Sequence, residues 1–167
     1  MKNFCFILCV LFCSITTFAQ DNDQVTTYYL IRHAEKSTFN PNDTNPVLSS
    51  EGINRAKKWA DVFAHVKLDA VYSTDYNRTK QTAKPTADSK KLPVFKFDET
   101  KMYDPAFKYN TTGSAVLVVG HSNTTPQLAN MILGKEEFPN IDENNYGNLY
   151  IITVTKERTT SLLLKIN

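Results

Sequence analysis

Two histidines and two arginines in this sequence are of types that can act together on an oxyanion. Arg32 and His33 are adjacent, and Arg78 and His121 follow at wide intervals. Two guanidinium groups present arrays of N–H donors that match a planar or tetrahedral oxyanion, and phosphate is their best match. An imidazole nitrogen can attack an electrophilic centre such as phosphorus. These residue types therefore favour phosphoryl chemistry, provided that the fold brings them together.

The fold must bring Arg32, Arg78 and His121 together, because they lie far apart in the sequence. Each follows a segment with the composition of a strand, and these segments are 25–31, 69–73 and 115–119. The third, AVLVV, is a continuous apolar run typical of a parallel strand buried on both faces. Ligands of open α/β sheets bind beyond the carboxyl ends of the strands, so we expect these side chains to share one crevice. A helix beginning near Thr124 would add unpaired backbone N–H groups to it.

Helical segments alternate with these strands. Ser49 or Ser50 can cap a helix whose expected apolar face carries Ile53, Ala56, Ala60 and Phe63. Further helices are expected at 76–87 and 126–133, further strands at 92–97, 148–154 and 160–166, and loops at 36–47 and 98–114. The alternation predicts a three-layer α/β/α sandwich with a mostly parallel sheet and an antiparallel edge.

Four segments form a recognisable pattern along the chain. They are LIRHAEK at 30–36, LSSEG followed by Arg55-Ala56 at 48–56, YST followed by RT and TA at 72–83, and VGHSNT at 119–124. With them the sequence resembles the histidine phosphatase superfamily, and within it the small branch similar to phosphohistidine phosphatases, from about Val25 to the C-terminus. The resemblance implies the phosphoglycerate-mutase-like fold. The family's usual glycine after Arg-His is Ala34 here, which we expect to tighten the pocket slightly without closing it.

The resemblance also implies roles for the residues that match the motifs. His33 would be the nucleophile, forming a phosphohistidine that water hydrolyses. Its ring must be neutral to attack, and neighbouring cations favour that state. Arg32, Arg78 and His121 would hold the phosphoryl oxygens, with Ser122 in the same phosphate site. No metal or other cofactor is implied.

The proton donor to the leaving group is less well defined by the sequence. The family's larger members place a carboxylate after the strand that follows the second arginine, where Asp98 and Glu99 lie. We favour Glu99, with Asp98 and Asp104 as rivals. Small phosphohistidine phosphatases of the superfamily manage without an obvious acid, because their leaving group is already a good one.

Composition excludes several other classes of protein. The 167 residues, 41% of them hydrophobic, suit one domain with a substantial core, and the net charge of +2 gives no reason to expect nucleic-acid binding. His33, His65 and His121 do not make a zinc motif, since there is no HExxH and the arginines would repel a cation. His65 is expected at a helix end, in a structural role.

The first nineteen residues read as a signal peptide followed by a single domain, 20–167. Lys2 precedes an apolar stretch too short for a comfortable membrane span, and Ala19 suits cleavage. An uncleaved anchor is the alternative. All three cysteines lie in this stretch, so the mature chain would have no thiol chemistry. We expect export, to a bacterial periplasm or the exterior.

These observations predict an exported, metal-independent phosphatase that hydrolyses phosphomonoesters through a phosphohistidine on His33. The alternatives are a phosphohistidine or phosphoprotein phosphatase, a phosphoglycerate-type mutase, and a pseudoenzyme that binds phosphate ligands. The expected partner is a phosphorylated small molecule or a phosphoprotein. By default the chain is a monomer.

Overall fold

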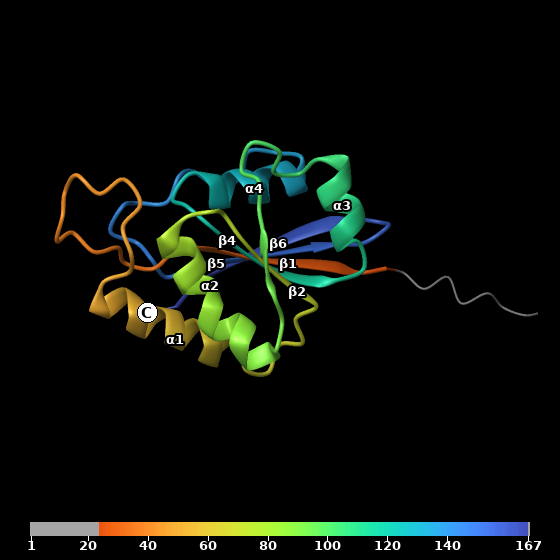
Figure 1. Ribbon diagram of the computed structural model, residues 1–167. Helices are drawn as coiled ribbons and strands as arrows, with labels where there is room; N and C mark the ends of the chain where they lie inside the picture. Colours follow the sequence, from red (N-terminus) through yellow and green to blue (C-terminus); the bar gives the residue numbers. More distant parts are fainter. Residues whose placement is uncertain (1–23, 167) are drawn as a thin grey trace, which may run out of the picture.

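A six-stranded sheet forms the centre of the computed structural model, which describes residues 24–166 (Figure 1). Its order is β3-β2-β4-β1-β5-β6. The pairs β3–β2, β2–β4 and β4–β1 are parallel, whereas β1–β5 and β5–β6 are antiparallel. The predicted mostly parallel sheet with an antiparallel edge is confirmed. The strands are β1 Thr26–Arg32, β2 Ala70–Ser73, β3 Val94–Lys96, β4 Ala115–Gly120, β5 Asn148–Val154 and β6 Thr159–Lys165.

The register of the three central strands aligns their carboxyl ends. Arg32 of β1 is paired with Gly120 of β4, and Ser73 of β2 is paired with Val119 of β4. The backbone N–H of His33 extends the ladder by donating to the Gly120 carbonyl at 2.9 Å. The residues that follow β1, β2 and β4 therefore leave the sheet side by side, as parallel strands require.

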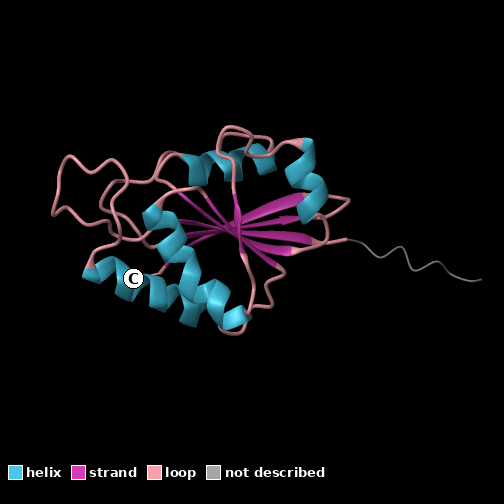
Figure 2. Cartoon of the chain, viewed as in Figure 1, coloured by secondary structure: helices cyan, strands magenta, loops and turns pink. Residues whose placement is uncertain are grey.

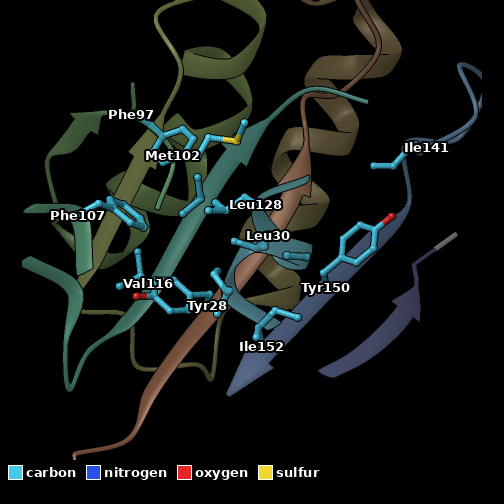
Figure 3. Packing of buried hydrophobic residues seen from close by; sticks show 13 residues of the cluster. Tyr28, Leu30, Phe97, Met102, Phe107, Val116, Leu128, Ile141, Tyr150 and Ile152 are labelled. Atoms are coloured by element: carbon cyan, nitrogen blue, oxygen red, sulfur yellow. The ribbon is translucent and has the colours of Figure 1, made fainter. Parts of the chain in front are cut away.

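Helices cover both faces of the sheet (Figures 1 and 2). One layer contains α1, Ser50–Val62, and α2, Asn77–Lys90, and the other contains α3, Pro105–Thr111, and α4, Thr124–Leu133. Successive strand residues point to opposite faces, so β1 supplies both cores. Tyr28 and Leu30 pack with Phe107 and Leu128 on the α3/α4 side (Figure 3). On the other side Ile31 packs with Trp59, Phe63 and Ala83.

The buried face of α1 agrees with the predicted one at Ala56 and Phe63 but differs from it at Ile53. Ser49 caps the helix as expected, and its Oγ accepts a hydrogen bond from the Gly52 N–H at 3.1 Å. Ile53, however, is 47% exposed, and the buried positions are Gly52, Ala56 and Trp59. The helix turns this face inward because Gly52 lies against the Glu35 carbonyl oxygen, where any Cβ would clash. That close approach rotates Ile53 toward solvent.

A short helix, α3, occupies part of the segment 98–114 that was expected to be a loop. Asp104 is its N-cap and accepts a hydrogen bond from the Phe107 N–H at 2.7 Å, and Pro105 lies in its first turn. Both are common helix-start features. With one buried aromatic residue in seven, the segment lacks the apolar repeat by which longer helices are recognised.

The segment 36–47 is a loop whose two ends are joined. The Ser37 N–H donates to the Val47 carbonyl at 2.8 Å, and Lys36 and Leu48 form an isolated antiparallel bridge. Within residues 24–166 no helix has the length and apolar character needed to cross a membrane. The predicted signal peptide, 1–19, lies outside the described residues.

Candidate active site

A cavity of about 340 Å³ opens at the carboxyl ends of β1, β2 and β4. It contains the four residues that the sequence singled out, together with Ser122 and Glu99. The first turn of α4 contributes to its wall. The lining residues are Arg32, His33, Lys36, Tyr76, Arg78, Glu99, His121, Ser122, Asn123, Thr124 and Glu143.

The ring of His33 is held in one tautomer. Its Nδ1 lies 2.7 Å from the Ala34 carbonyl oxygen, and because a carbonyl can only accept, Nδ1 carries the proton. The lone pair of the neutral ring is therefore on Nε2. Burial lowers the pKa of His33 to about 3, with Arg32 and Arg78 acting in the same direction and the bond to Ala34 opposing it. The imidazole is thus neutral near pH 7, the state that a nucleophile needs.

His121 is fixed by a chain of hydroxyl groups. The Thr79 hydroxyl donates to the carbonyls of Thr74 and Tyr76 at 2.9 and 3.0 Å, so it accepts from the Thr74 hydroxyl at 3.0 Å. Thr74 Oγ1 is then left to accept from Nε2–H of His121, also at 3.0 Å. Burial lowers the pKa of His121 to about 4, and the charges of the two arginines add to this. The second imidazole is therefore also neutral near pH 7.

The guanidinium of Arg32 is almost wholly occupied by the segment before β5. Nη1 donates to the carbonyls of Asp142, Glu143 and Asn145 at 3.0 to 3.1 Å, and Nη2 donates to Glu143 Oε2 at 2.7 Å. The Tyr146 ring stacks on it, with its centroid 4.3 Å from Cζ. Arg32 was expected to hold phosphoryl oxygens together with Arg78, but its Nη1 and Nη2 already have partners within the chain. Its Nε is buried and has no hydrogen-bond partner in the described part of the chain.

Arg78 has a similar unpaired donor. It lies in the first turn of α2, where its guanidinium stacks on the Tyr76 ring at 4.5 Å. Its Nε is buried and, like that of Arg32, lacks a hydrogen-bond partner within residues 24–166. A buried donor without a partner costs about 1–3 kcal/mol, a cost that the fold sustains at both arginines.

Of the three candidate acids, only Glu99 lies at the cavity. Its Oε2 is 3.5 Å from His121 Nε2, a contact that is not an ion pair near pH 7 because the ring is neutral. Asp98 instead accepts from the N–H and hydroxyl of Thr100 at 2.9 and 2.6 Å. Asp104 is engaged as the cap of α3. Asp98 and Asp104 were candidates because of their positions in the sequence. In the structure, local hydrogen bonds engage both carboxylates, and neither residue lines the cavity.

Ala34 does not narrow the cavity. Its methyl group is fully buried and packs with Leu48 and Ala56, outside the residues that line the cavity. Its N–H donates to Thr82 Oγ1 at 2.9 Å, and that hydroxyl donates to the Arg78 carbonyl at 2.8 Å. The residue that departs from the family pattern therefore helps to connect the loop after β1 with α2.

Sequence reasoning missed Glu143 and Tyr146. Both lie in a polar segment without periodicity, and their contacts with Arg32 join residues more than a hundred positions apart. His65 is exposed in the turn after α1 and does not line the cavity. Among residues 24–166 there is no group of three His, Cys, Asp or Glu side chains placed to hold a metal ion.

Comparison with known proteins gives one family. Residues 28–101 match the model of the histidine phosphatase superfamily (branch 1), a range that includes Arg32, His33, Arg78 and Glu99 but ends before His121. No curated protein matches the chain at a significant level.

Several solved structures share the fold. The protein histidine phosphatase SixA, complexed with tungstate, has a TM-score of 0.67 and 17% identity over 83% of this chain and 96% of that chain. The α-ribazole phosphatase from Shigella flexneri has a TM-score of 0.61 and 16% identity, over 84% and 98% of the two chains. Bacillus stearothermophilus YhfR has a TM-score of 0.67 and 16% identity, over 85% and 98%.

Proposed function

We propose that this chain, which belongs to the histidine phosphatase superfamily, is a metal-independent phosphatase acting through a phosphohistidine on His33. One observation carries the proposal. His33 presents a neutral Nε2 lone pair in a cavity that the side chains of Arg32 and Arg78 also line. A nucleophile beside two guanidinium groups suits attack on a phosphoryl group.

In the proposed first step, Nε2 of His33 attacks phosphorus and the bond from phosphorus to the leaving oxygen breaks. Glu99, as the carboxylic acid, gives its proton to that oxygen. In the second step water attacks the phosphohistidine, Glu99 takes the proton of the water, and the P–N bond breaks to release phosphate. Arg32 and Arg78 stabilise the charge on the phosphoryl oxygens in both steps, assisted by Ser122. A bound phosphoryl dianion favours the protonated form of His121, in which Nδ1–H can also donate to it.

Protein phosphohistidine is a second candidate substrate, beside small phosphomonoesters. It is favoured by the fold shared with the protein histidine phosphatase SixA, whose bound tungstate is a tetrahedral oxyanion like phosphate. The P–N bond of phosphohistidine needs less help from an acid than an alkyl phosphate does. We further propose that the protein is exported, because residues 1–19 have the charge and apolar pattern of a signal peptide.

The decisive experiment is hydrolysis of an aryl phosphate by the wild type and by His33→Ala, each with and without excess chelator. We expect the wild type to be active in both conditions and the variant to be inactive in both. A brief reaction with radioactive phosphomonoester should leave label on the wild-type protein that is stable to alkali and lost in acid. Activity that disappears with chelator, or label that persists in His33→Ala, would contradict the proposal.

Substrate preference is tested in the same preparation. A phosphohistidine-containing protein and a set of alkyl and aryl phosphates are compared by kcat/KM. Preference for the phosphohistidine protein, together with insensitivity to Glu99→Gln, would favour the second candidate.

A further inference from the structure

The carboxylate of Glu143 occupies the mouth of the cavity and bridges two predicted phosphate-binding groups. Its Oε2 accepts from Nη2 of Arg32 at 2.7 Å, and its Oε1 accepts from the Ser122 hydroxyl at 2.7 Å. A carboxylate held by a guanidinium and a hydroxyl uses the same donors as two oxygens of a phosphate. Phosphate and the Glu143 carboxylate therefore compete for Arg32 and Ser122.

The side chain can leave without disturbing the backbone beneath it. The Glu143 side chain is 73% exposed, whereas the side chain of Arg32 is 3% exposed. The segment itself stays anchored, because Nη1 of Arg32 bonds to three of its carbonyls and the Ile141 N–H donates to the Ser122 carbonyl at 2.8 Å. A change of rotamer would move the carboxylate into water and free Nη2 of Arg32.

The charge of the cavity makes this competition matter. Its lining carries three cations, Arg32, Arg78 and Lys36, and two carboxyl groups, Glu99 and Glu143. The net charge is +1 when both are ionised and +2 when Glu99 carries the proton that it donates in the proposed first step. The hydrogen bond from Ser122, and then the charges of Arg32 and Lys36, hold the pKa of Glu143 below its usual range, so it is ionised near pH 7. Removing the negative charge of Glu143 would make the lining one unit more positive and so favour the binding of a phosphate dianion.

We propose that Glu143 is an internal anion that phosphate must displace, and that it thereby sets the affinity of the site for phosphate. The inference rests on the proposed function only in taking this cavity as the phosphate site. Glu143 acts by weakening the binding of free phosphate, and so limits inhibition by product. A purely structural role, in which Glu143 orients Arg32 for phosphate, makes the opposite prediction for a neutral variant.

The test is titration calorimetry of inorganic phosphate into the wild type and Glu143→Gln, at pH 7.5 and constant ionic strength. We expect the Kd for phosphate to fall at least about fivefold in the variant, because a like charge about 4 Å away is removed. Glu143→Ala should change in the same direction. The control Glu157→Gln, in the turn between β5 and β6, makes the same chemical change away from the cavity and should leave the Kd unchanged.

An unchanged or raised Kd in Glu143→Gln would overturn the inference, and thermal unfolding of each variant verifies that the protein is folded. If phosphate bound neither the wild type nor Glu143→Gln, both the inference about Glu143 and the proposed phosphate site would be wrong. Arg78→Ala separates the two ideas, since it should lose phosphate binding if the cavity is the site. Tighter phosphate binding in Glu143→Gln, in a protein that hydrolyses no phosphate compound, would support the inference and reject the proposed function.

Discussion

The rings of His33 and His121 stand edge to face across the cavity, with their centroids 5.4 Å apart and an angle of 67° between their planes. They come from the ends of two neighbouring parallel strands, β1 and β4. Each ring is fixed by a hydrogen bond on one nitrogen, Nδ1 of His33 and Nε2 of His121. The pair therefore places one nucleophilic nitrogen beside a second ring, whose Nδ1 can donate to the same anion when that ring is protonated.

Acid should destabilise the protein through these two rings. The folded-state pKa values of about 3 and about 4 lie below the unfolded value of about 6.5, so the unfolded chain binds more protons between these limits. Stability should consequently fall as the pH is lowered from about 6.5 toward 4. Thermal unfolding across this range should show a weaker pH dependence in His33→Asn and His121→Asn than in the wild type. An identical dependence in all three proteins would mean that the folded-state pKa values are not depressed.

Thr74→Val should impair catalysis through His121. The substitution keeps the shape of the side chain but removes the oxygen that accepts from Nε2–H of the ring. We expect kcat to fall about tenfold with a smaller change in KM, and the free energy of unfolding to fall by about 1–2 kcal/mol as buried hydrogen bonds are lost. Thr160→Val, at an exposed position of β6, is the matched control and should change neither kinetic constant. Equal effects of the two substitutions would exclude a positioning role for Thr74.

Glu99→Gln should slow the hydrolysis of alkyl phosphates about 100-fold, because a general acid contributes roughly this much when the leaving group is poor. Activated aryl phosphates should be affected far less. Asp98→Asn and Asp104→Asn, whose carboxylates bond to Thr100 and to the start of α3, serve as controls and should leave both rates close to wild type. If alkyl and aryl substrates lose activity equally in Glu99→Gln, the acid lies elsewhere.

Gly52→Ala should be markedly destabilising, since the new methyl group would meet the Glu35 carbonyl oxygen. Overpacking of this kind costs about 1–3 kcal/mol, and Glu35 lies two residues after His33, so activity should fall as well. Ile53→Ala in the next position is the comparison. Its side chain is 47% exposed, and we expect a loss below about 1 kcal/mol in urea unfolding. If Ile53→Ala proved more destabilising than Gly52→Ala, Ile53 would lie in the core, as the helical repeat alone predicts.

The residues at the strand ends could be predicted from sequence because local patterns fix where each strand stops. Arg32, His33 and His121 directly follow strands whose composition is unmistakable, and parallel pairing then aligns them. Glu143 could not be found in this way. Its position depends on how a long polar connection returns to the sheet. That connection has no hydrophobic periodicity from which its course could be predicted.

The apolar repeat of α1 is correct at Ala56 and Phe63, which are buried, but it failed at Ile53 for a related reason. Ile53 has the spacing of a core residue in α1, yet a single backbone contact, between Gly52 and Glu35, decides which face of the helix turns inward. Asp104 likewise has the residue type and approximate distance of an acid, but the same carboxylate satisfies the N–H of Phe107. In both cases a local interaction overrides a pattern that the sequence displays clearly.

Three backbone carbonyls accept hydrogen bonds from Arg32, and these bonds limit where the chain can gain or lose residues during evolution. They tie Arg32, a proposed phosphate-binding residue, to the backbone between Ile141 and Asn148, so adding or deleting a residue there would shift the guanidinium itself. The loop 36–47 is different, because its ends are joined to each other and only Lys36, at one end, lines the cavity. Asn45 ties its later part to Asn77 at the start of α2, so the part before Asn45 is the freest to change in length. New substrate preferences can therefore evolve by lengthening the loop, whereas the segment around Glu143 must keep its length.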